Sequence, residues 1–193
     1  YDVIPGGKGA NQALAARRAG AHVMMIGAVG KDPFAAIGTA LMQEAGIDLS
    51  AMSDVDAPTG AAFITVDAKG ENAITVASGA NAFATADNLK NLSLGPKDTL
   101  LMQREVPETQ QIEAARIARA KGSRVLLNVA PAGVIAEDLV KLVDILIMNE
   151  HEAMAVASGM GLQCDTPENN ARMIADERGI STIVTLGAEG AVG

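Results

Sequence analysis

The run from Gly6 to Ala13 combines glycines, a lysine and side-chain amides in a spacing that suits ligand binding. Gly6 and Gly7 let the backbone bend sharply and approach a ligand closely. Lys8 can donate hydrogen bonds to hydroxyl oxygens, and Asn11 can both donate and accept them. The chain then enters a predicted alanine-rich helix, whose free N–H groups favour a polar ligand at its start. This pattern predicts a binding site for a polar small molecule.

Two common phosphate-binding motifs are excluded at this position. A Walker A loop needs Ser or Thr directly after its Gly-Lys pair, and Gly9 stands there instead. A dinucleotide fingerprint would need Gly or Ala where Gln12 stands. The helix is expected from Asn11 to Ala19. An ordinary strand-to-helix turn, with Lys8 as a solvated side chain, is the alternative interpretation.

Four predicted strands end in polar or glycine-rich sequences. Ligands of open α/β sheets bind beyond the carboxyl ends of the strands, so endings of this kind on one edge predict a site for hydroxyl-rich ligands and metal-bound phosphates. Local structure is the alternative, because Asn149 with Glu152 can form a helix capping box, and Gly187 with Gly190 can form a hairpin turn. The four endings are Arg104-Glu105, Asn128-Val129-Ala130-Pro131, Asn149-Glu150-His151-Glu152 and Thr185-Leu186-Gly187-Ala188-Glu189-Gly190.

Strands alternate with helices among the elements that must position these groups. We therefore predict an α/β fold with a mostly parallel sheet flanked by helices on both faces. Asp32 is the expected N-cap of one helix, with Pro33 at its first position. The predicted strands are His22–Ala28, Asp98–Gln103, Arg124–Asn128, Asp144–Met148 and Thr182–Leu186, and the further predicted helices are Pro33–Ala45, Glu108–Lys121, Ile135–Leu142, Glu150–Ala157 and Glu168–Arg178.

A β-hairpin interrupts this alternation. Ala61–Asp67 and Asn72–Ala77 are rich in strand-forming residues and are joined by a glycine-containing turn. The segment from Tyr1 to Ile4 resembles the end of a strand, and we expect it to pair with the hairpin. Residues 1–193 are interpreted as one incomplete α/β domain, with a small separate β element formed by residues of about 1–5 and 60–78.

Composition narrows the class of protein. The 193 residues carry a formal net charge of −8, and 49% of them are apolar, which predicts a globular protein and disfavours nonspecific nucleic-acid binding. Cys164 is the sole cysteine, which excludes an internal disulfide and fits a reducing, cytoplasmic compartment. No run of about 18 uninterrupted apolar residues exists, so no membrane partner is expected.

Four motifs occur in a defined order along nearly the whole chain. They are Gly6–Ala13, the strand end Met102-Gln103-Arg104-Glu105, Asn149-x-x-Glu152 and the turn Thr185-Leu186-Gly187. In this ordered set the chain resembles the ribokinase-like (PfkB) carbohydrate kinases. The lysine after the paired glycines favours members that act on ribose, because fructokinase-like relatives usually lack it. The resemblance implies an ATP-dependent kinase that phosphorylates the 5-hydroxyl of D-ribose, on an α/β sandwich with a small β-sheet lid.

The resemblance also implies a role for each matching residue. Glu152 would help to hold Mg²⁺ through water, since magnesium keeps several of its waters. The hairpin with Tyr1–Ile4 would form the lid that excludes water from the sugar. ATP and Mg²⁺ are the implied cofactors, with K⁺ as a third candidate. The implied sugar contacts are Gly7, Lys8, Gly9, Ala10, Asn11 and Glu105, and the implied nucleotide contacts are Asn149, Thr185, Leu186, Gly187, Ala188, Glu189 and Gly190.

The family's catalytic base has no counterpart in this chain. That base is an aspartate in a Gly-Ala-Gly-Asp motif near the family's C-terminus, and the motif does not occur here. The family's sugar-gripping aspartate near the N-terminus and its cation-binding segments near the C-terminus have no match either. Because both Tyr1 and Gly193 fall within predicted strands, we interpret the chain as an internal piece of a longer protein. Phosphoryl transfer needs a base and preorganised amides, so residues 1–193 alone are expected to be inactive.

Alternatives to a ribose kinase stay open at this point. The first alternative is another kinase of the family, which phosphorylates a different sugar or a nucleoside. The second is a non-catalytic protein on the same scaffold, which binds a sugar or a nucleotide. Lid strands of family members often pair between subunits, and an unpaired lid edge would otherwise be exposed. The resemblance therefore favours a homodimer formed through the lid.

Overall fold

The structure is a computed structural model that describes residues 2–66, 69–70, 72–162 and 166–193. Tyr1, Cys164 and most of the hairpin turn lie outside the described residues. The chain divides into two compact units. The first comprises Tyr1–Asn88 with Glu105–Pro107, and the second comprises Leu89–Arg104 with Glu108–Gly193.

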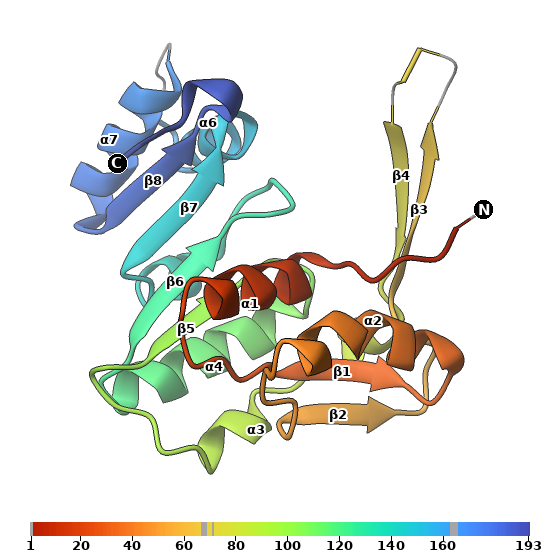
Figure 1. Cartoon of the computed structure of the whole chain (residues 1–193). Coiled ribbons are helices and arrows are strands. Elements are labelled where there is room, and N and C mark those ends of the chain that lie inside the picture. Colours follow the sequence, from red (N-terminus) through yellow and green to blue (C-terminus); the bar gives the residue numbers. More distant parts are fainter. Residues whose placement is uncertain (1, 67–68, 71, 163–165) are drawn as a thin grey trace. The chain divides into compact units, whose positions relative to one another are not determined.

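The first unit packs two helices beside a short pair of parallel strands (Figure 1). Its elements are α1 (Lys8–Arg18), β1 (Gly27–Gly30), α2 (Pro33–Glu44), β2 (Met52–Val55), β3 (Ala61–Val66), β4 (Asn72–Ala77) and the 3-10 helix η1 (Gly79–Phe83). Ala13 of α1, Met42 of α2 and Ile47 form a small buried core. A second core joins Ala28 of β1 to Ala80 of η1. Burial of these side chains fixes α1 against α2 and η1 against β1.

The starts of two elements in this unit differ from the prediction. α1 begins at Lys8 rather than at Asn11, because Gly7 takes the N-cap position with a φ of 101° that suits glycine. The strand predicted over 22–28 is paired only from Gly27 onward, apart from one bridge of Met24 to Asp48. Its partner β2 was not predicted, because two polar residues interrupt its apolar character.

The hairpin of β3 and β4 confirms the prediction for residues 61–77. Its strands are antiparallel, with Ile64 opposite Ile74. The described residues of this sheet form two strands only, and Asp2 to Ile4 are in no strand. The prediction that the N-terminal segment extends the hairpin is therefore wrong for its described residues. Val3 and Ile4 are 45% and 75% exposed. Strand-forming residues gain nothing from the extended form when they have no ladder partner, which explains why no strand forms here.

The second unit is built on a sheet in the order β5-β6-β7-β8-β9. Its elements are α3 (Asp87–Lys90) at the boundary between the units, then β5 (Thr99–Met102), α4 (Glu108–Ala120), β6 (Arg124–Asn128), α5 (Glu137–Val140), β7 (Ile145–Asn149), α6 (Glu150–Gly159), α7 (Pro167–Arg178), β8 (Ser181–Thr185), the 3-10 helix η2 (Gly187–Glu189) and β9 (Ala191–Val192). The first four strands are parallel, and β9 is antiparallel to β8. This confirms the predicted α/β class.

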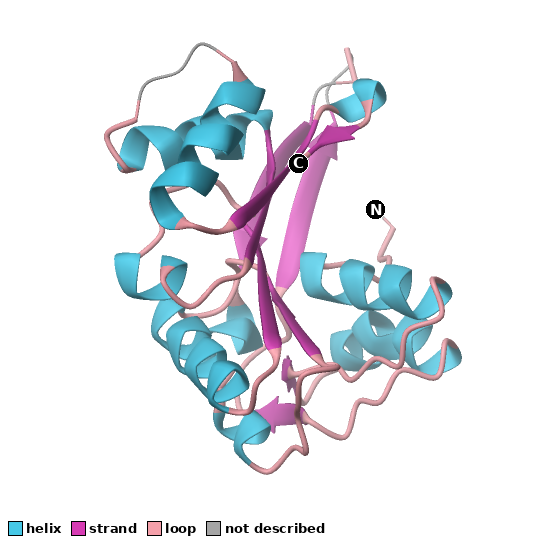
Figure 2. Ribbon diagram, turned by 90° about the vertical axis from the view of Figure 1, so that its left-hand side faces the viewer, coloured by secondary structure: helices cyan, strands magenta, loops and turns pink. Residues whose placement is uncertain are grey.

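Burial alternates along the strands of this sheet. Val125, Leu127, Leu146, Met148 and Val184 are fully buried and occupy alternate positions of β6, β7 and β8. The helices α4, α6 and α7 contact these strands and cover one face of the sheet (Figure 2). Right-handed crossovers between strands in sequential order put their helices on one face, which explains this pattern. The opposite face carries the residues between these positions, and the polar carboxyl ends of β6, β7 and β8 belong to it.

The helix α5 is half as long as predicted. α5 runs over Glu137–Val140, whereas the apolar pattern predicted Ile135–Leu142. Ala136 has φ −57° and ψ 135°, an extended conformation that prevents the helix from beginning earlier. Ile135 is nevertheless 93% buried, so its apolar character reflects packing of a loop rather than of a helix.

Candidate functional site

The glycine-rich run folds into the first turn of α1. Gly7 is the N-cap, and its carbonyl accepts a hydrogen bond of 2.9 Å from the Asn11 N–H. Lys8, Gly9 and Ala10 are therefore the first helical residues, and N–H groups at these positions have no acceptor within their own helix. They are oriented toward the space before the helix, where the helix dipole favours oxygen atoms with negative character. This geometry suits a hydroxyl-rich or anionic ligand.

Glu105 joins this helix start from far along the sequence. The Lys8 Nζ lies 2.6 Å from the Glu105 Oε1 in an ion pair. Their side chains are 41% and 26% exposed, so ligand atoms can reach both. The structure thus brings together the predicted sugar-binding residues of the first unit. A cationic donor beside an anionic acceptor matches adjacent hydroxyl groups, each of which both donates and accepts.

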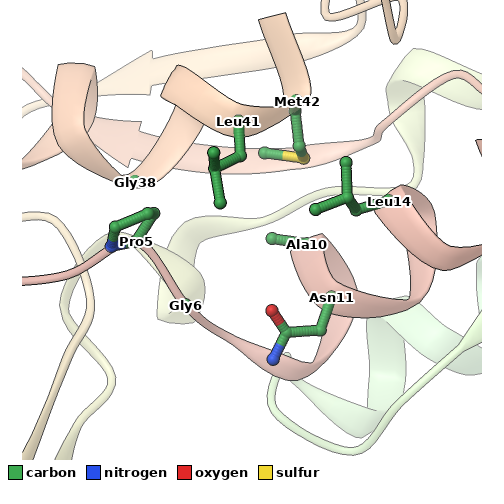
Figure 3. Close-up of a pocket in the computed structure, with 8 residues that line it drawn as sticks. All are labelled: Pro5, Gly6, Ala10, Asn11, Leu14, Gly38, Leu41 and Met42. Carbon is green, nitrogen blue, oxygen red and sulfur yellow. The ribbon is translucent and has the colours of Figure 1, made fainter. Parts of the chain in front are cut away.

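The hollow beside the helix start is too small to be the ligand site itself. It measures about 10 Å³, roughly the space of one water. Figure 3 shows that Ala10 and Leu14 of α1 face Leu41 and Met42 of α2 across it. Asn11 lines its edge beside Gly6 and is exposed. Apolar packing therefore fixes the helix, and Asn11 lies at the exposed border.

The predicted nucleotide-binding residues gather in the second unit. Asn149 ends β7, Thr185 ends β8, and the two are direct partners in the parallel register. The Thr185 hydroxyl donates to the Met148 carbonyl at 3.4 Å. Because paired residues of neighbouring strands point to the same face, both side chains belong to one polar strand edge. The structure thus confirms that these sequence-distant residues are neighbours.

Glu152 has a structural role that is established by its contacts. The Asn149 Oδ1 accepts from the Glu152 N–H at 2.8 Å, and the Glu152 Oε2 accepts from the Asn149 N–H at 2.8 Å. These two bonds form a capping box, which is the local structural interpretation of Asn149 and Glu152. Glu152 is 7% exposed. A carboxylate that is both buried and engaged in this way fits a metal contact through water better than direct coordination.

The turn after β8 is a hairpin turn that presents backbone groups to solvent. Gly187 and Gly190 have φ of 56° and 97°, which favours glycine at both positions. The Leu186 N–H donates to the Gly190 carbonyl at 2.8 Å and closes the turn toward β9. Residues 187–190 are all exposed. The turn can therefore approach a ligand closely without rearranging side chains.

Two polar residues at strand ends donate side-chain hydrogen bonds to backbone carbonyls. The Arg104 Nη atoms donate to the carbonyls of Pro131 and Val134 at 3.1 and 2.7 Å, which holds the loop after β6. The Asn128 Nδ2 donates to the Ile147 carbonyl at 3.1 Å and links β6 to β7. The sequence shows both residues only as strand endings, because the acceptors of their bonds are backbone atoms of other elements.

The described residues contain no group of three or more His, Cys, Asp or Glu side chains arranged to hold a metal ion. No helix in the described part of the chain is long and apolar enough to cross a membrane.

The fold and the polar strand edge place this chain among the open α/β proteins, a class in which ligands bind beyond the carboxyl ends of the strands. A family model for the pfkB family of carbohydrate kinases matches residues 1–193, and the chain belongs to that family. It is 37% identical over 194 residues to the ribokinase of Haemophilus influenzae, covering 98% of this chain and 63% of that protein. It is 37% identical over 189 residues to the ribokinase of Staphylococcus aureus, covering 96% and 62%.

Solved structures agree with this assignment. A structure of Arabidopsis thaliana ribokinase complexed with ribose and ATP matches with a TM-score of 0.83 at 27% identity, covering 98% of this chain and 63% of that one. The ribokinase of Thermotoga maritima matches with a TM-score of 0.81 at 32% identity, with the same coverage. The chain thus spans about 63% of the length of these relatives.

Proposed function

We propose that the protein containing this chain is an ATP-dependent kinase that transfers the γ-phosphate of ATP to the 5-hydroxyl of D-ribose. The observation that carries the proposal is the Lys8–Glu105 pair at the start of α1, at 2.6 Å. It places a charged donor and a charged acceptor beside the free N–H groups of a helix, as a polyhydroxyl ligand requires. The relatives named above are ribokinases, and one of them is described in complex with ribose and ATP.

The sugar is bound by the first unit in this proposal. Lys8 donates to one sugar hydroxyl, and Glu105 accepts from a neighbouring one. Asn11 adds a donor and an acceptor. The backbone of Gly7, Gly9 and Ala10 approaches the sugar closely, because glycine and alanine leave that space open.

The nucleotide is bound by the second unit. Asn149 and the turn Thr185–Gly190, which includes Leu186, Ala188 and Glu189, contact ATP at the carboxyl ends of β7 and β8. Glu152 holds Mg²⁺ through a water molecule, and Mg²⁺ when bound neutralises charge on the phosphates. The aspartate base of the family has no counterpart among residues 1–193, and K⁺-binding segments have none either. We therefore expect this chain alone to be inactive.

The hairpin of β3 and β4 is the proposed lid and the proposed dimer contact. Ile64, Val66, Ile74 and Val76 are on one face of it and are between 56% and 62% exposed. An exposed apolar face with open strand edges favours pairing with a second copy. Ile64→Lys is expected to convert a dimer into a monomer in analytical ultracentrifugation. A wild-type protein that is already monomeric would contradict the dimer.

One observation favours a second acceptor sugar. The chain is 31% identical over 192 residues to a protein of Salmonella typhi named deoxyribokinase, covering 97% of this chain and 62% of that protein. 2-Deoxyribose also carries a 5-hydroxyl, so the same transfer applies to it. The two candidates differ in whether the 2-hydroxyl contributes to binding.

The deciding experiment assays the complete protein with ATP, Mg²⁺ and a panel of ribose, 2-deoxyribose, fructose and adenosine. We expect ADP formation to be fastest with ribose, and NMR of the product to place the phosphate on the 5-oxygen. Faster turnover of 2-deoxyribose would replace ribose as the substrate. Ribose binding in calorimetry without ADP formation would instead indicate a non-catalytic binding protein.

A further inference from the structure

Asp32 connects two elements of the first unit. Its Oδ1 accepts from the N–H groups of Phe34 and Ala35 at 3.0 and 3.2 Å, which caps α2 as predicted. The same carboxylate accepts from the Thr59 N–H at 2.7 Å through Oδ2 and from the Thr59 hydroxyl at 2.8 Å through Oδ1. Capping alone needs only the first pair of bonds. The second pair fixes the residue that lies two positions before β3.

Thr59 completes a closed set of hydrogen bonds. Its hydroxyl donates to Asp32 and accepts from the Gly30 N–H at 2.9 Å. The end of β1, the start of α2 and the entry to β3 are thereby joined through one side chain. The Thr59 N–H contributes most to holding the pKa of the Asp32 carboxyl below its ordinary value of 3.8, so the carboxylate is ionised at neutral pH.

The backbone is packed closely at the base of the hairpin. A Cβ added to Gly30 would lie 2.6 Å from the Thr59 nitrogen, and one added to Gly60 would lie 2.8 Å from the Ser78 carbonyl oxygen. Gly79, with φ 49°, would clash with the carbonyl of Pro58. These approaches leave no room for a side chain at any of the three glycines, so both strands of the hairpin emerge from a tightly packed junction.

The rest of the hairpin has little support of its own. Residues 62–66 and 73–77 are all exposed. Exposed strands without packing partners reorient easily, so the direction of the hairpin depends on how its base is held. That base is the Asp32–Thr59 set of hydrogen bonds together with the Ala80 N–H, which donates to the Pro58 carbonyl at 2.7 Å.

We propose that Asp32 and Thr59 are positioning residues, which hold the hairpin at the angle from which it closes over the sugar. The inference rests on the proposed function of the hairpin as a lid. Neither residue touches the sugar in this proposal. They act through the junction, and a loose junction makes closure over the sugar less frequent.

Thr59→Val and Thr59→Ser in the complete protein form the main test. Valine keeps the shape but removes the hydroxyl, and serine retains it. We expect Thr59→Val to raise the KM for ribose about tenfold, the size of one lost hydrogen bond to a charged group, with the KM for ATP changed less than about twofold. Thr59→Ser is expected to restore the wild-type value. Amide hydrogen exchange over residues 61–77 is expected to rise in Thr59→Val, while α1 remains protected.

Asp32→Asn and Asp48→Asn are the matched charge variants. Asp48 also accepts from a nearby backbone N–H, that of Ser50 at 2.8 Å, but among the described residues it makes no hydrogen bond to the hairpin base. We expect only Asp32→Asn to reproduce the Thr59→Val effect. An unchanged ribose KM in Thr59→Val, or an equal effect of Thr59→Ser or Asp48→Asn, overturns the inference.

The hydrogen-exchange measurement tests the positioning role of Asp32 and Thr59 separately from the proposed kinase function. A wild-type protein that neither binds nor phosphorylates ribose contradicts the proposed function. In that case, faster exchange of the hairpin in Thr59→Val still supports the role of Thr59 in holding the hairpin, and unchanged exchange contradicts it.

Discussion

Lys8→Met separates what the ion pair at the start of α1 contributes to the fold from what it contributes to the ligand. Methionine keeps the apolar stem of the side chain and removes the ammonium group that lies 2.6 Å from the Glu105 carboxylate. If the pair serves mainly to tie Glu105 to α1, stability falls and sugar binding is unaffected. If it serves the sugar, the reverse holds.

The exposure of the pair sets the expected magnitude. With side chains 41% and 26% exposed, it belongs to the class of solvent-screened pairs, which contribute at most about 1 kcal/mol to stability. A hydrogen bond from a charged group to a ligand is worth about 1.5–3 kcal/mol, or about 10-fold to 100-fold in affinity. We therefore expect Lys8→Met to reduce the free energy of unfolding by less than about 1 kcal/mol and to raise the ribose KM about 10-fold to 100-fold.

The assay combines urea unfolding with steady-state kinetics of the complete protein. Arg116→Met is the control, because Arg116 and Asp138 form an exposed pair at 3.9 Å in the second unit. The control is expected to leave the ribose KM unchanged. A loss of more than about 2 kcal/mol of stability in Lys8→Met, with a ribose KM within about twofold of wild type, would refute the ligand role.

Further tests concern stability, metal binding and pH. The Lys121 Nζ donates to three carbonyls of residues 89–92 at 3.3, 2.8 and 2.6 Å. Lys121→Met is therefore expected to lower the free energy of unfolding in urea by about 1–2 kcal/mol, and a decrease below about 0.5 kcal/mol contradicts this. Glu152→Gln retains an acceptor for the Asn149 N–H but loses the negative charge. This variant is expected to melt near the wild-type temperature and to need severalfold more Mg²⁺ for activity. An Mg²⁺ dependence equal to that of wild type contradicts the metal role. The pKa of Asp32 is lowered in the folded protein, so its stabilising effect is complete above the ordinary pKa of 3.8 and disappears as the pH falls through the lower folded pKa. Wild type and Asp32→Asn should therefore converge in unfolding free energy only below pH 3.8. A stability difference that stays constant into strong acid contradicts this.

Local signals in the sequence were sufficient for much of the fold. Asp32 before Pro33 predicted a cap that the structure confirms, and Asn149 with Glu152 predicted the capping box. In both cases the hydrogen bonds join residues two or three positions apart, so the chain itself brings the partners together. The alternation of strands with helices along the sequence predicted the parallel sheet, because parallel neighbours are joined through helical crossovers.

The contacts that organise the site are of a different kind. Lys8 and Glu105 are 97 positions apart, and Asp32 and Thr59 are 27 apart. No local preference selects such partners, since they depend on how whole elements pack. The N-terminal segment shows the converse error. Val3 and Ile4 have strand-forming side chains, yet without a ladder partner this composition did not produce a strand.

The division of the chain matches the division of the two proposed ligands. All proposed sugar contacts, including Glu105, belong to the first unit, and all proposed nucleotide contacts belong to the second. Glu105 is separated from the sheet residue Met102 by only two positions, so the chain passes between the units at this point. Substitutions in separate units without shared partners are expected to have additive effects on binding.

Phosphoryl transfer, in contrast, requires both ligands to be positioned at once. If the proposed function holds, Lys8→Met and Thr185→Val together distinguish effects on ligand binding from effects on phosphoryl transfer. Lys8→Met should change only the dissociation constant for ribose, and Thr185→Val only that for ATP. For each ligand, the change in binding free energy in the double variant should equal the sum of the changes in the two single variants within about 0.5 kcal/mol. The effect on kcat should be non-additive, because either substitution alone already misaligns the reacting groups. Coupled dissociation constants in the double variant would show that the two units do not bind their ligands independently.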